Sequence, residues 1–181
     1  MNRVHTAHTA DLDPFTRRAA RALLVEACAG GFTAHHWEHA LGGIHALLWE
    51  DGELIGHAAL VQRRLLHGGR ALRVGYVEAL AVRADRRRRG HGAALLGALE
   101  RLIRGGYQLG ALSAAEGTAR FCAHRGWRQW RGPTFALTPL GIARTQADDG
   151  GIYVYPVPAG GPAHLDTSAE LVCDWRDGEV W

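Results

Sequence analysis

A loop rich in arginine and glycine, set between an apolar segment and an amphipathic one, constrains this chain more than any other feature. Residues 77–82 are apolar on both alternating faces except at Glu78, which is typical of a central β-strand. Apolar residues between positions 94 and 103 recur at helical spacing and predict a helix that ends near Arg104. The chain must therefore pass from a buried strand into a helix N-terminus through the segment Arg87-x-x-Gly90-x-Gly92.

The chemistry of this loop favours a bound phosphate. A helix N-terminus leaves backbone N–H groups unpaired and carries partial positive charge. Glycines let the backbone approach an anion, and Arg83 and Arg86 to Arg89 concentrate positive charge in a chain whose net charge is only +3. The loop is neither a Walker motif nor a full Gly-x-Gly-x-x-Gly fingerprint. Two alternatives stay open: a solvated charged loop, and a nucleic-acid patch, against which the absence of interleaved aromatic residues counts.

Glu78 is the one charged residue of the apolar strand before the loop. A carboxylate in such a strand must be paired, have its pKa raised by desolvation, or face a cleft. Each of these environments can produce a general base that works near neutral pH. The alternative is a structural ion pair, for example with Arg73.

The composition predicts one compact, soluble domain over residues 1–181, because 47% of the residues are apolar and no stretch is long enough to span a membrane. The N-terminus has no signal-peptide core, so we expect a cytoplasmic protein. The cysteines, Cys28, Cys122 and Cys173, are odd in number and lack metal-ligand spacing, which favours free thiols. Six histidines show no zinc pattern with them, namely His35, His36, His39, His45, His57 and His67. Most are expected at the surface or in the core, and His36 is the exception because of its place in the sequence.

Turn residues and periodicity predict helices interspersed with a mixed sheet. The expected strands are residues 3–8, 44–49, 54–66, 72–82, 107–113, 127–137, 152–157 and 169–173. The expected helices run from Pro14 to near Gly30, over 35–41, through the segment after the arginine loop, and over 118–125. Residues 138–150 and 158–168 are expected to be loops. This order predicts an α/β (α+β) fold with a mixed central sheet flanked by helices.

The strand, Glu78 and the loop together resemble the GNAT superfamily of N-acetyltransferases, whose signature is Gln/Arg-x-x-Gly-x-Gly/Ala. Segments in the same order along nearly the whole chain resemble one group of that superfamily, the aminoglycoside 2'-N-acetyltransferases. These segments are Trp37 to Gly43, Gly75 to Glu78, Tyr107 to Gly110, Arg125 to Trp127, and Cys173 to Arg176 with Trp181. The resemblance implies a GNAT acyltransferase fold, acetyl-CoA as donor, an aminoglycoside as acceptor, a homodimer, and no metal, nucleic-acid or membrane partner.

The resemblance also implies roles for residues at the donor site. The backbone of Leu80, Ala81 and Val82 would pair with the pantetheine arm. The pyrophosphate would be held by the amides of Arg87, Arg88, Arg89, Gly90, His91, Gly92 and Ala93. Glu78 would draw the proton from the amine through water, and the Leu80 amide would stabilise the oxyanion.

At the acceptor site, the resemblance implies that Ala79 and Ser113 line the cleft. Asp148 or Asp149 and the carboxylate of Trp181 would contact the drug, which suits a polycation. On the residues alone, Asp148 to Gly150 could be only a turn and Trp181 a frayed terminus.

Three positions depart from the group's pattern. Gly31 and His36 stand where aspartate is common, so two negative charges toward the drug are missing. Kasugamycin, an aminoglycoside with fewer charges, is therefore the favoured acceptor. Cys122 stands where a tyrosine is the proposed acid, and its thiol could donate that proton or only fill space. Two other functions stay open: a GNAT enzyme acting on a protein N-terminus or a polyamine, and a non-catalytic RNA-binding module.

Overall fold

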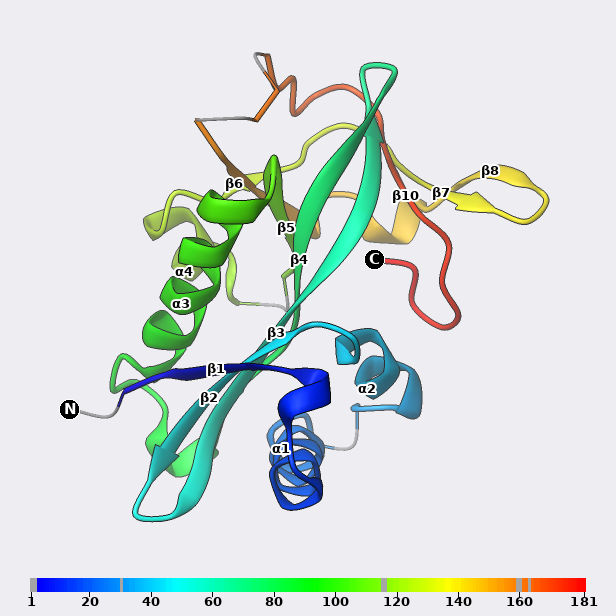
Figure 1. Ribbon diagram of the computed structural model, residues 1–181. Helices are drawn as coiled ribbons and strands as arrows, with labels where there is room; N and C mark the ends of the chain where they lie inside the picture. Colours follow the sequence, from blue (N-terminus) through cyan, green and yellow to red (C-terminus); the bar gives the residue numbers. More distant parts are fainter. Residues whose placement is uncertain (1–2, 30, 115–116, 159–160, 163) are drawn as a thin grey trace. The chain divides into compact units, whose positions relative to one another are not determined.

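A computed structural model describes residues 3–29, 31–114, 117–158, 161–162 and 164–181. The chain divides into two compact units, residues 1–61 with 77–101, and residues 62–76 with 102–181. Strands β3 (Glu53–His67) and β4 (Arg70–Val82) and helix α3 (His91–Gly106) each contribute residues to both units (Figure 1).

In the first unit, an antiparallel arrangement of strands carries two helices. β1 (His5–His8) pairs with β2 (Ile44–Glu50), and β2 pairs with the first part of β3. α1 (Pro14–Ala27) begins where the Asp13 carboxylate accepts a hydrogen bond from Thr16 N at 2.9 Å. α2 (Ala34–Ala40) follows after a short connection. The core between α1 and the strands is formed by Leu12, Ala20, Leu23, Leu47 and Leu54.

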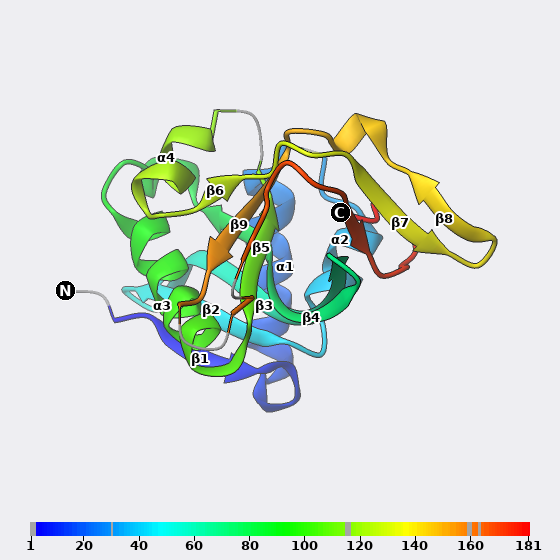
Figure 2. The same ribbon diagram turned by 90° about the horizontal axis from the view of Figure 1, so that it is seen from above.

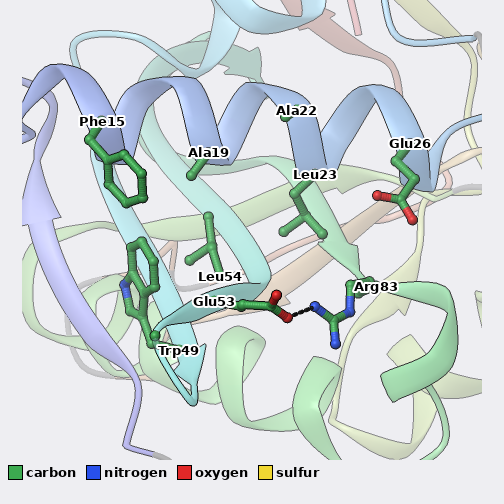
Figure 3. A pocket seen from close by; sticks show the side chains of 10 residues that line it. Phe15, Ala19, Ala22, Leu23, Glu26, Trp49, Glu53, Leu54 and Arg83 are labelled. Atoms are coloured by element: carbon green, nitrogen blue, oxygen red, sulfur yellow. Dashed lines mark hydrogen bonds and ion pairs between the residues drawn. The ribbon is translucent and has the colours of Figure 1, made fainter.

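A small open groove lies along α1 beside the β2–β3 turn, and Figure 3 shows its lining. Its volume is about 270 Å³, and its floor is mostly apolar. Phe15 stacks on Trp49 at one end, with ring centroids 6.3 Å apart. Arg83 and Glu53 form an ion pair at the other end (Figure 3). Arg83 therefore lines this groove and is paired with a carboxylate there.

The second unit contains the rest of the mixed sheet. β5 (Leu109–Ser113) runs parallel to β4, with pairs from Val74–Leu109 to Tyr76–Ala111, and antiparallel to β9 (Ile152–Pro156). β9 also pairs with β6 (Arg128–Gln129), so it lies between β5 and β6 (Figure 2). On the other side, β3 is followed by β10 (Leu171–Cys173), β7 (Thr134–Thr138) and β8 (Gly141–Arg144). Parallel and antiparallel pairs coexist, which confirms the expected mixed sheet.

A buried arginine ties the last strand to β3. Arg63 is only 4% exposed; its Nε donates to Asp174 Oδ1 at 2.7 Å and its Nη2 to the Asp174 carbonyl at 2.9 Å. The guanidinium also lies 4.8 Å from the centroid of the Tyr76 ring. These contacts hold the segment after β10 against the centre of the unit's sheet.

Most predicted elements are present with ends that differ by a few residues, and two predictions are wrong. Residues 138–150 are not a loop throughout, because β8 and a 3₁₀ turn at Gln146–Asp148 lie within them. All four residues of β8 are exposed. Because neither face of this strand is buried, its sequence does not need to alternate between apolar and polar residues, and periodicity does not reveal it. Four further elements have the predicted type: α4 (Ala119–His124), β5, β9 and β10.

Residues 127–137 are also not one strand, because β6 and β7 are separated by residues 130–133. The amides of Arg131 and Gly132 donate to the Thr167 carbonyl instead of to a neighbouring strand. A Cβ on Gly132 would lie 1.9 Å from the Ala169 carbonyl oxygen, so only glycine allows this close approach. Pro133 has no N–H to donate to a ladder. The backbone therefore leaves the strand at this point.

Candidate active site

Strand β4 changes direction locally at Ala79, next to Glu78. Ala79 has a φ of 51°, a left-handed conformation that L-residues avoid at a cost of about 1 kcal/mol. Glu78, Ala79 and Leu80 are partly exposed in succession, whereas Val77 and Ala81 are buried. A left-handed residue inside a strand re-aims the neighbouring side chains and interrupts pairing, as in a β-bulge. The strand therefore presents Glu78 and the Ala79–Leu80 peptide in a geometry that a regular strand would not give.

Two buried histidines hold this irregular backbone. His57 Nδ1 lies 3.0 Å from the Ala79 carbonyl oxygen, and His57 Nε2 lies 2.9 Å from His45 Nδ1. His45 Nε2 lies 2.8 Å from Thr9 Oγ1. Both imidazoles are 0% exposed. Burial lowers the pKa of both histidines to about 4, with the neighbouring His57 adding to the effect on His45.

The sequence prediction placed these histidines among ordinary surface or core residues and missed this connection. Each lies within an apolar run, Ile44 to Leu48 or Ile55 to Leu60. A histidine inside a buried strand needs a hydrogen-bond partner, which is the signal that could have singled them out. The identity of the partner is decided by tertiary pairing alone.

The arginine loop has the backbone geometry of an anion cradle. Arg88 and Gly90 both have left-handed φ values, 63° and 83°. The Ala94 amide donates to the Gly90 carbonyl at 3.0 Å, which is the first turn of α3, so the amides of residues 91–93 precede the intrahelical ladder. Successive N–H groups in such a turn point into one concavity and favour negative charge.

The arginines of this region divide into two groups. Arg83 pairs with Asp85 and Glu53, and Arg86 pairs with Glu50 and Asp85. Arg87 donates from Nε to the Val82 carbonyl and from Nη2 to the Ala27 carbonyl, both at 3.1 Å. These three side chains therefore support the loop rather than extend from it.

Arg88 and Arg89 form the second group. Both are exposed, and within the described part of the chain neither side chain makes a hydrogen bond or an ion pair. Their charge is uncompensated by a local carboxylate, so these two guanidinium groups are the ones that an anion at the loop could recruit.

His36 has a local role in α2. Its Nδ1 accepts a hydrogen bond from Thr33 N at 2.9 Å, and Thr33 Oγ1 accepts from His36 N at 3.4 Å, which completes a capping box. The ring also stacks on Phe32 with centroids 5.6 Å apart. Gly31 is exposed just before this helix, where its amide donates to the Cys28 carbonyl.

In the second unit, Asp149 is already engaged by its neighbours. Its Oδ1 accepts from Thr134 N and Thr134 Oγ1, each at 3.0 Å, and Arg144 forms an ion pair with the carboxylate. The Arg144 guanidinium, followed by the Thr134 donors, holds the pKa of Asp149 far below its usual range. In contrast, burial and the nearby Asp149 raise the pKa of Asp148. Asp148 is the carboxylate whose charge is poorly stabilised by the protein alone.

The other predicted residues of this unit lie at the end of β5, on α4 and at the C-terminus. Ser113 is exposed at the end of β5, one residue beyond Leu112. Cys122 lies on α4 and is 2% exposed, and no disulfide bond links the cysteines in the described part of the chain. Trp181 is 5% exposed and its Nε1 donates to Thr145 Oγ1 at 2.9 Å, so the alternative of a frayed terminus is wrong.

Comparison with known proteins identifies the family. The profile described as "Acetyltransferase (GNAT) family" matches residues 10–127. The chain belongs to the GNAT family of acetyltransferases. It is 52% identical over 181 residues to the aminoglycoside 2'-N-acetyltransferase of Mycolicibacterium fortuitum, a match that covers 98% of this chain and 93% of that protein.

Solved structures show the same fold at low identity. The ribosomal-protein-S18-alanine N-acetyltransferase of Escherichia coli has a TM-score of 0.59 at 19% identity, over 92% of this GNAT chain and all (100%) of that one. ElaA of Escherichia coli has a TM-score of 0.62 at 13% identity, over 86% of this chain and 99% of that one. The expected fold class and the acyltransferase class are confirmed.

No described helix is both long and apolar enough to cross a membrane. No cluster of three or more histidine, cysteine or acidic residues suited to a metal ion occurs in the part of the chain that the structure covers.

The buried histidines predict a pH-dependent stability. Their pKa of about 4 in the folded state lies below the unfolded value of 6.5, so the unfolded chain binds more protons between these limits. Stability is therefore lost as the pH falls from 6.5 to 4. Between pH 7 and 5, His57→Asn should reduce the loss of unfolding free energy by about 1–2 kcal/mol relative to wild type. Urea titrations measure this, and the exposed His124→Asn should leave the loss unchanged. Equal losses in wild type and His57→Asn would contradict the assignment.

Proposed function

We propose that this GNAT chain transfers the acetyl group of acetyl-CoA to the 2'-amino group of an aminoglycoside antibiotic and thereby confers resistance. The observation that carries the proposal is the 52% identity, along almost the full length of both chains, to a protein named as an aminoglycoside 2'-N-acetyltransferase. The geometry around Glu78 and the arginine loop supports it, because a base and an anion cradle follow each other along one strand and loop.

The loop residues fit a pyrophosphate donor such as coenzyme A. The amides of residues 87–93 would hold the pyrophosphate, with the left-handed turns at Arg88 and Gly90 shaping the cradle. The side chains of Arg88 and Arg89 would add charge, whereas that of Arg87 supports the loop. The backbone of Leu80, Ala81 and Val82 would pair with the pantetheine arm. Acetyl-CoA supplies the acetyl thioester when it is bound.

The chain's own residues would provide the acid–base chemistry. Glu78, half-buried on β4, would accept the proton of the attacking amine through a water molecule. The Leu80 N–H would donate a hydrogen bond to the carbonyl oxygen on which negative charge develops. Direct attack of the amine on the thioester would form the amide bond, break the C–S bond and release coenzyme A as a thiolate that takes up a proton, with no covalent intermediate on the enzyme.

Among the predicted acceptor residues, Asp148 is favoured over Asp149. The charge of Asp149 is neutralised by Arg144, whereas burial and Asp149 raise the pKa of Asp148. An ammonium group placed beside Asp148 would relieve that cost, so a cationic sugar is a natural partner. Ala79 and Ser113 would line the cleft, and the proposed roles of Gly31, His36 and Trp181 rest on the resemblance. The homodimer and the cytoplasmic location stay predictions.

We further propose kasugamycin as the preferred acceptor. Gly31 cannot carry charge, and His36 Nδ1 is turned back to cap α2. Two carboxylates that would bind a highly charged drug are therefore replaced by groups without negative charge. Each lost contact costs on the order of 0.5–3 kcal/mol for a drug that depends on it, and a less charged drug loses least.

The acceptor is tested by following thiol release from acetyl-CoA with a panel of amines. Kasugamycin should be turned over with kcat/KM at least about tenfold above gentamicin and tobramycin, because about 1.4 kcal/mol of lost contact corresponds to a factor of ten. A protein N-terminal peptide and spermidine serve as acceptors of other classes. Fast turnover of gentamicin would refute the preference for kasugamycin, and turnover of the peptide alone would refute the aminoglycoside function.

Glu78 and Cys122 should respond differently to substitution. Glu78→Gln keeps the shape of the side chain but removes the base, so kcat should fall about 10²- to 10⁴-fold with acetyl-CoA affinity preserved. Cys122 is buried on α4, and Cys122→Ala should leave kcat within about threefold. Steady-state kinetics and calorimetric titration with acetyl-CoA measure both. An unchanged rate in Glu78→Gln, or a loss in Cys122→Ala as large as that expected for Glu78, would reverse the assignment.

The exposed arginines of the loop should affect donor affinity and little else. The double variant Arg88→Ala/Arg89→Ala should raise the KM for acetyl-CoA about tenfold, because two exposed charge-assisted contacts are worth about 1–2 kcal/mol together. The matched control is Arg18→Ala/Arg21→Ala, which removes two exposed arginines from α1. An equal rise of KM in both double variants would show a general effect of charge instead.

A further inference from the structure

The Ala79–Leu80 peptide links the core of the first unit to the proposed reaction. A trans peptide is planar, so its carbonyl and its N–H point in opposite directions. No cis peptide occurs among the residues that the structure describes. The direction of the Ala79 carbonyl therefore fixes the direction of the Leu80 N–H, the proposed donor to the developing negative charge.

The Ala79 carbonyl is held by His57, and His57 is held in turn. Because the carbonyl can only accept, His57 Nδ1 must carry the proton of their 3.0 Å contact. His57 Nε2 then accepts from His45 Nδ1 at 2.9 Å, which leaves His45 Nε2 to accept from the Thr9 hydroxyl at 2.8 Å. The Gly43 carbonyl lies 3.1 Å from the same hydroxyl, so the His45 contact is the shorter of the two that compete for its proton. Both rings are neutral above their pKa of about 4, so each has one donor and one acceptor. The chain of hydrogen bonds thus has a single direction, from Thr9 to the Ala79 carbonyl.

This arrangement is more than filling of the core. Two imidazoles that are 0% exposed cost free energy that apolar side chains of similar size would not. Trp37 packs against both rings, with centroid distances of 6.1 Å to His45 and 6.3 Å to His57, and restricts their rotation. Alanine has no intrinsic preference for the left-handed φ of Ala79, so a contact from outside the strand must maintain it.

We infer that His57 is a positioning residue for acyl transfer, which holds the Ala79–Leu80 peptide so that the Leu80 N–H points away from the buried rings. His45 and Thr9 support it by fixing the tautomer of His57. The inference deepens the proposed function and rests on it for the role of the Leu80 amide. All three side chains act through the Ala79–Leu80 peptide, and none of them touches the reacting atoms.

Substitutions of His57 separate the hydrogen bond from the packing. His57→Asn places an amide N–H close to the position of Nδ1 and keeps the donor to the Ala79 carbonyl. His57→Leu keeps an apolar side chain of similar size and removes the donor. The matched control is His67→Leu, because His67 is also a buried histidine of β3. Its ring packs on Trp130, and its Nδ1 lies 3.2 Å from the Glu170 carbonyl oxygen.

The kinetic result expected is a loss of kcat without loss of donor binding. His57→Leu should lower kcat about 10- to 100-fold, somewhat less than the removal of an oxyanion donor, with the Kd for acetyl-CoA within about threefold of wild type. His57→Asn should retain kcat within about fivefold. His67→Leu should retain it within about threefold even if it lowers the melting temperature equally. Equal losses of kcat in His57→Asn and His57→Leu, or in His67→Leu, would overturn the inference.

A readout without any acceptor keeps this test independent of the proposed substrate. In protein labelled with ¹⁵N-leucine, the Leu80 amide of wild type and His57→Asn should give one resonance that shifts when acetyl-CoA is added. In His57→Leu it should be broadened or split, because the peptide samples two directions. An unperturbed Leu80 resonance in His57→Leu would refute the role of His57.

If His57→Leu does not fold, a second variant is Thr9→Val, which removes the hydroxyl that contacts His45 Nε2 and the Gly43 carbonyl. Thr9→Val should still lower kcat several-fold and broaden the Leu80 resonance, and no change in either would overturn the inference. If wild type acetylates no aminoglycoside, the proposed function fails, whereas the Leu80 resonance still decides the role of His57.

Discussion

The hydrogen bond from His57 to the Ala79 carbonyl is the contact on which the irregular part of strand β4 depends. It fixes a left-handed alanine between a candidate base, Glu78, and a candidate backbone donor, Leu80. A regular strand would alternate these groups between two faces and pair every amide with its neighbours. The irregular strand exposes three successive residues instead, and it does so because two histidines are buried beneath it. Burying the two imidazoles costs free energy, and their hydrogen bonds hold the backbone in the geometry that the proposed reaction would need.

The arginine loop illustrates a second constraint, which is that a charged side chain already paired with a neighbouring group is not available to a ligand. Arg83, Arg86 and Arg87 are occupied by carboxylates or backbone carbonyls of the same unit, and these contacts define the path of the chain into α3. Arg88 and Arg89 are exposed. A run of arginines that looks uniform in the sequence therefore has a part that supports the loop and a part that faces solvent.

A similar division occurs between the adjacent acids Asp148 and Asp149. Asp149 joins Thr134 and Arg144, and the Thr134 hydroxyl in turn accepts from Thr145 at 2.8 Å, the residue that binds the Trp181 indole. This network anchors Trp181 within its unit. Asp148 stands outside these contacts and has its pKa raised by burial, so the two neighbours have opposite electrostatic characters.

The sequence by itself determined the class of fold and the strand–loop–helix unit that contains Glu78 and the arginine loop, because local signals encode them. Helical spacing, glycine turns and an apolar strand interrupted by Glu78 depend on residues close together in the chain. Tertiary structure alone decided that β8 is a strand, that Gly132 breaks the segment before β7, and which arginine and which aspartate are engaged. The same holds for His45 and His57, whose partners, 12 and 22 residues away, come from other strands. Such pairings are set by sheet register and burial, which no local pattern specifies.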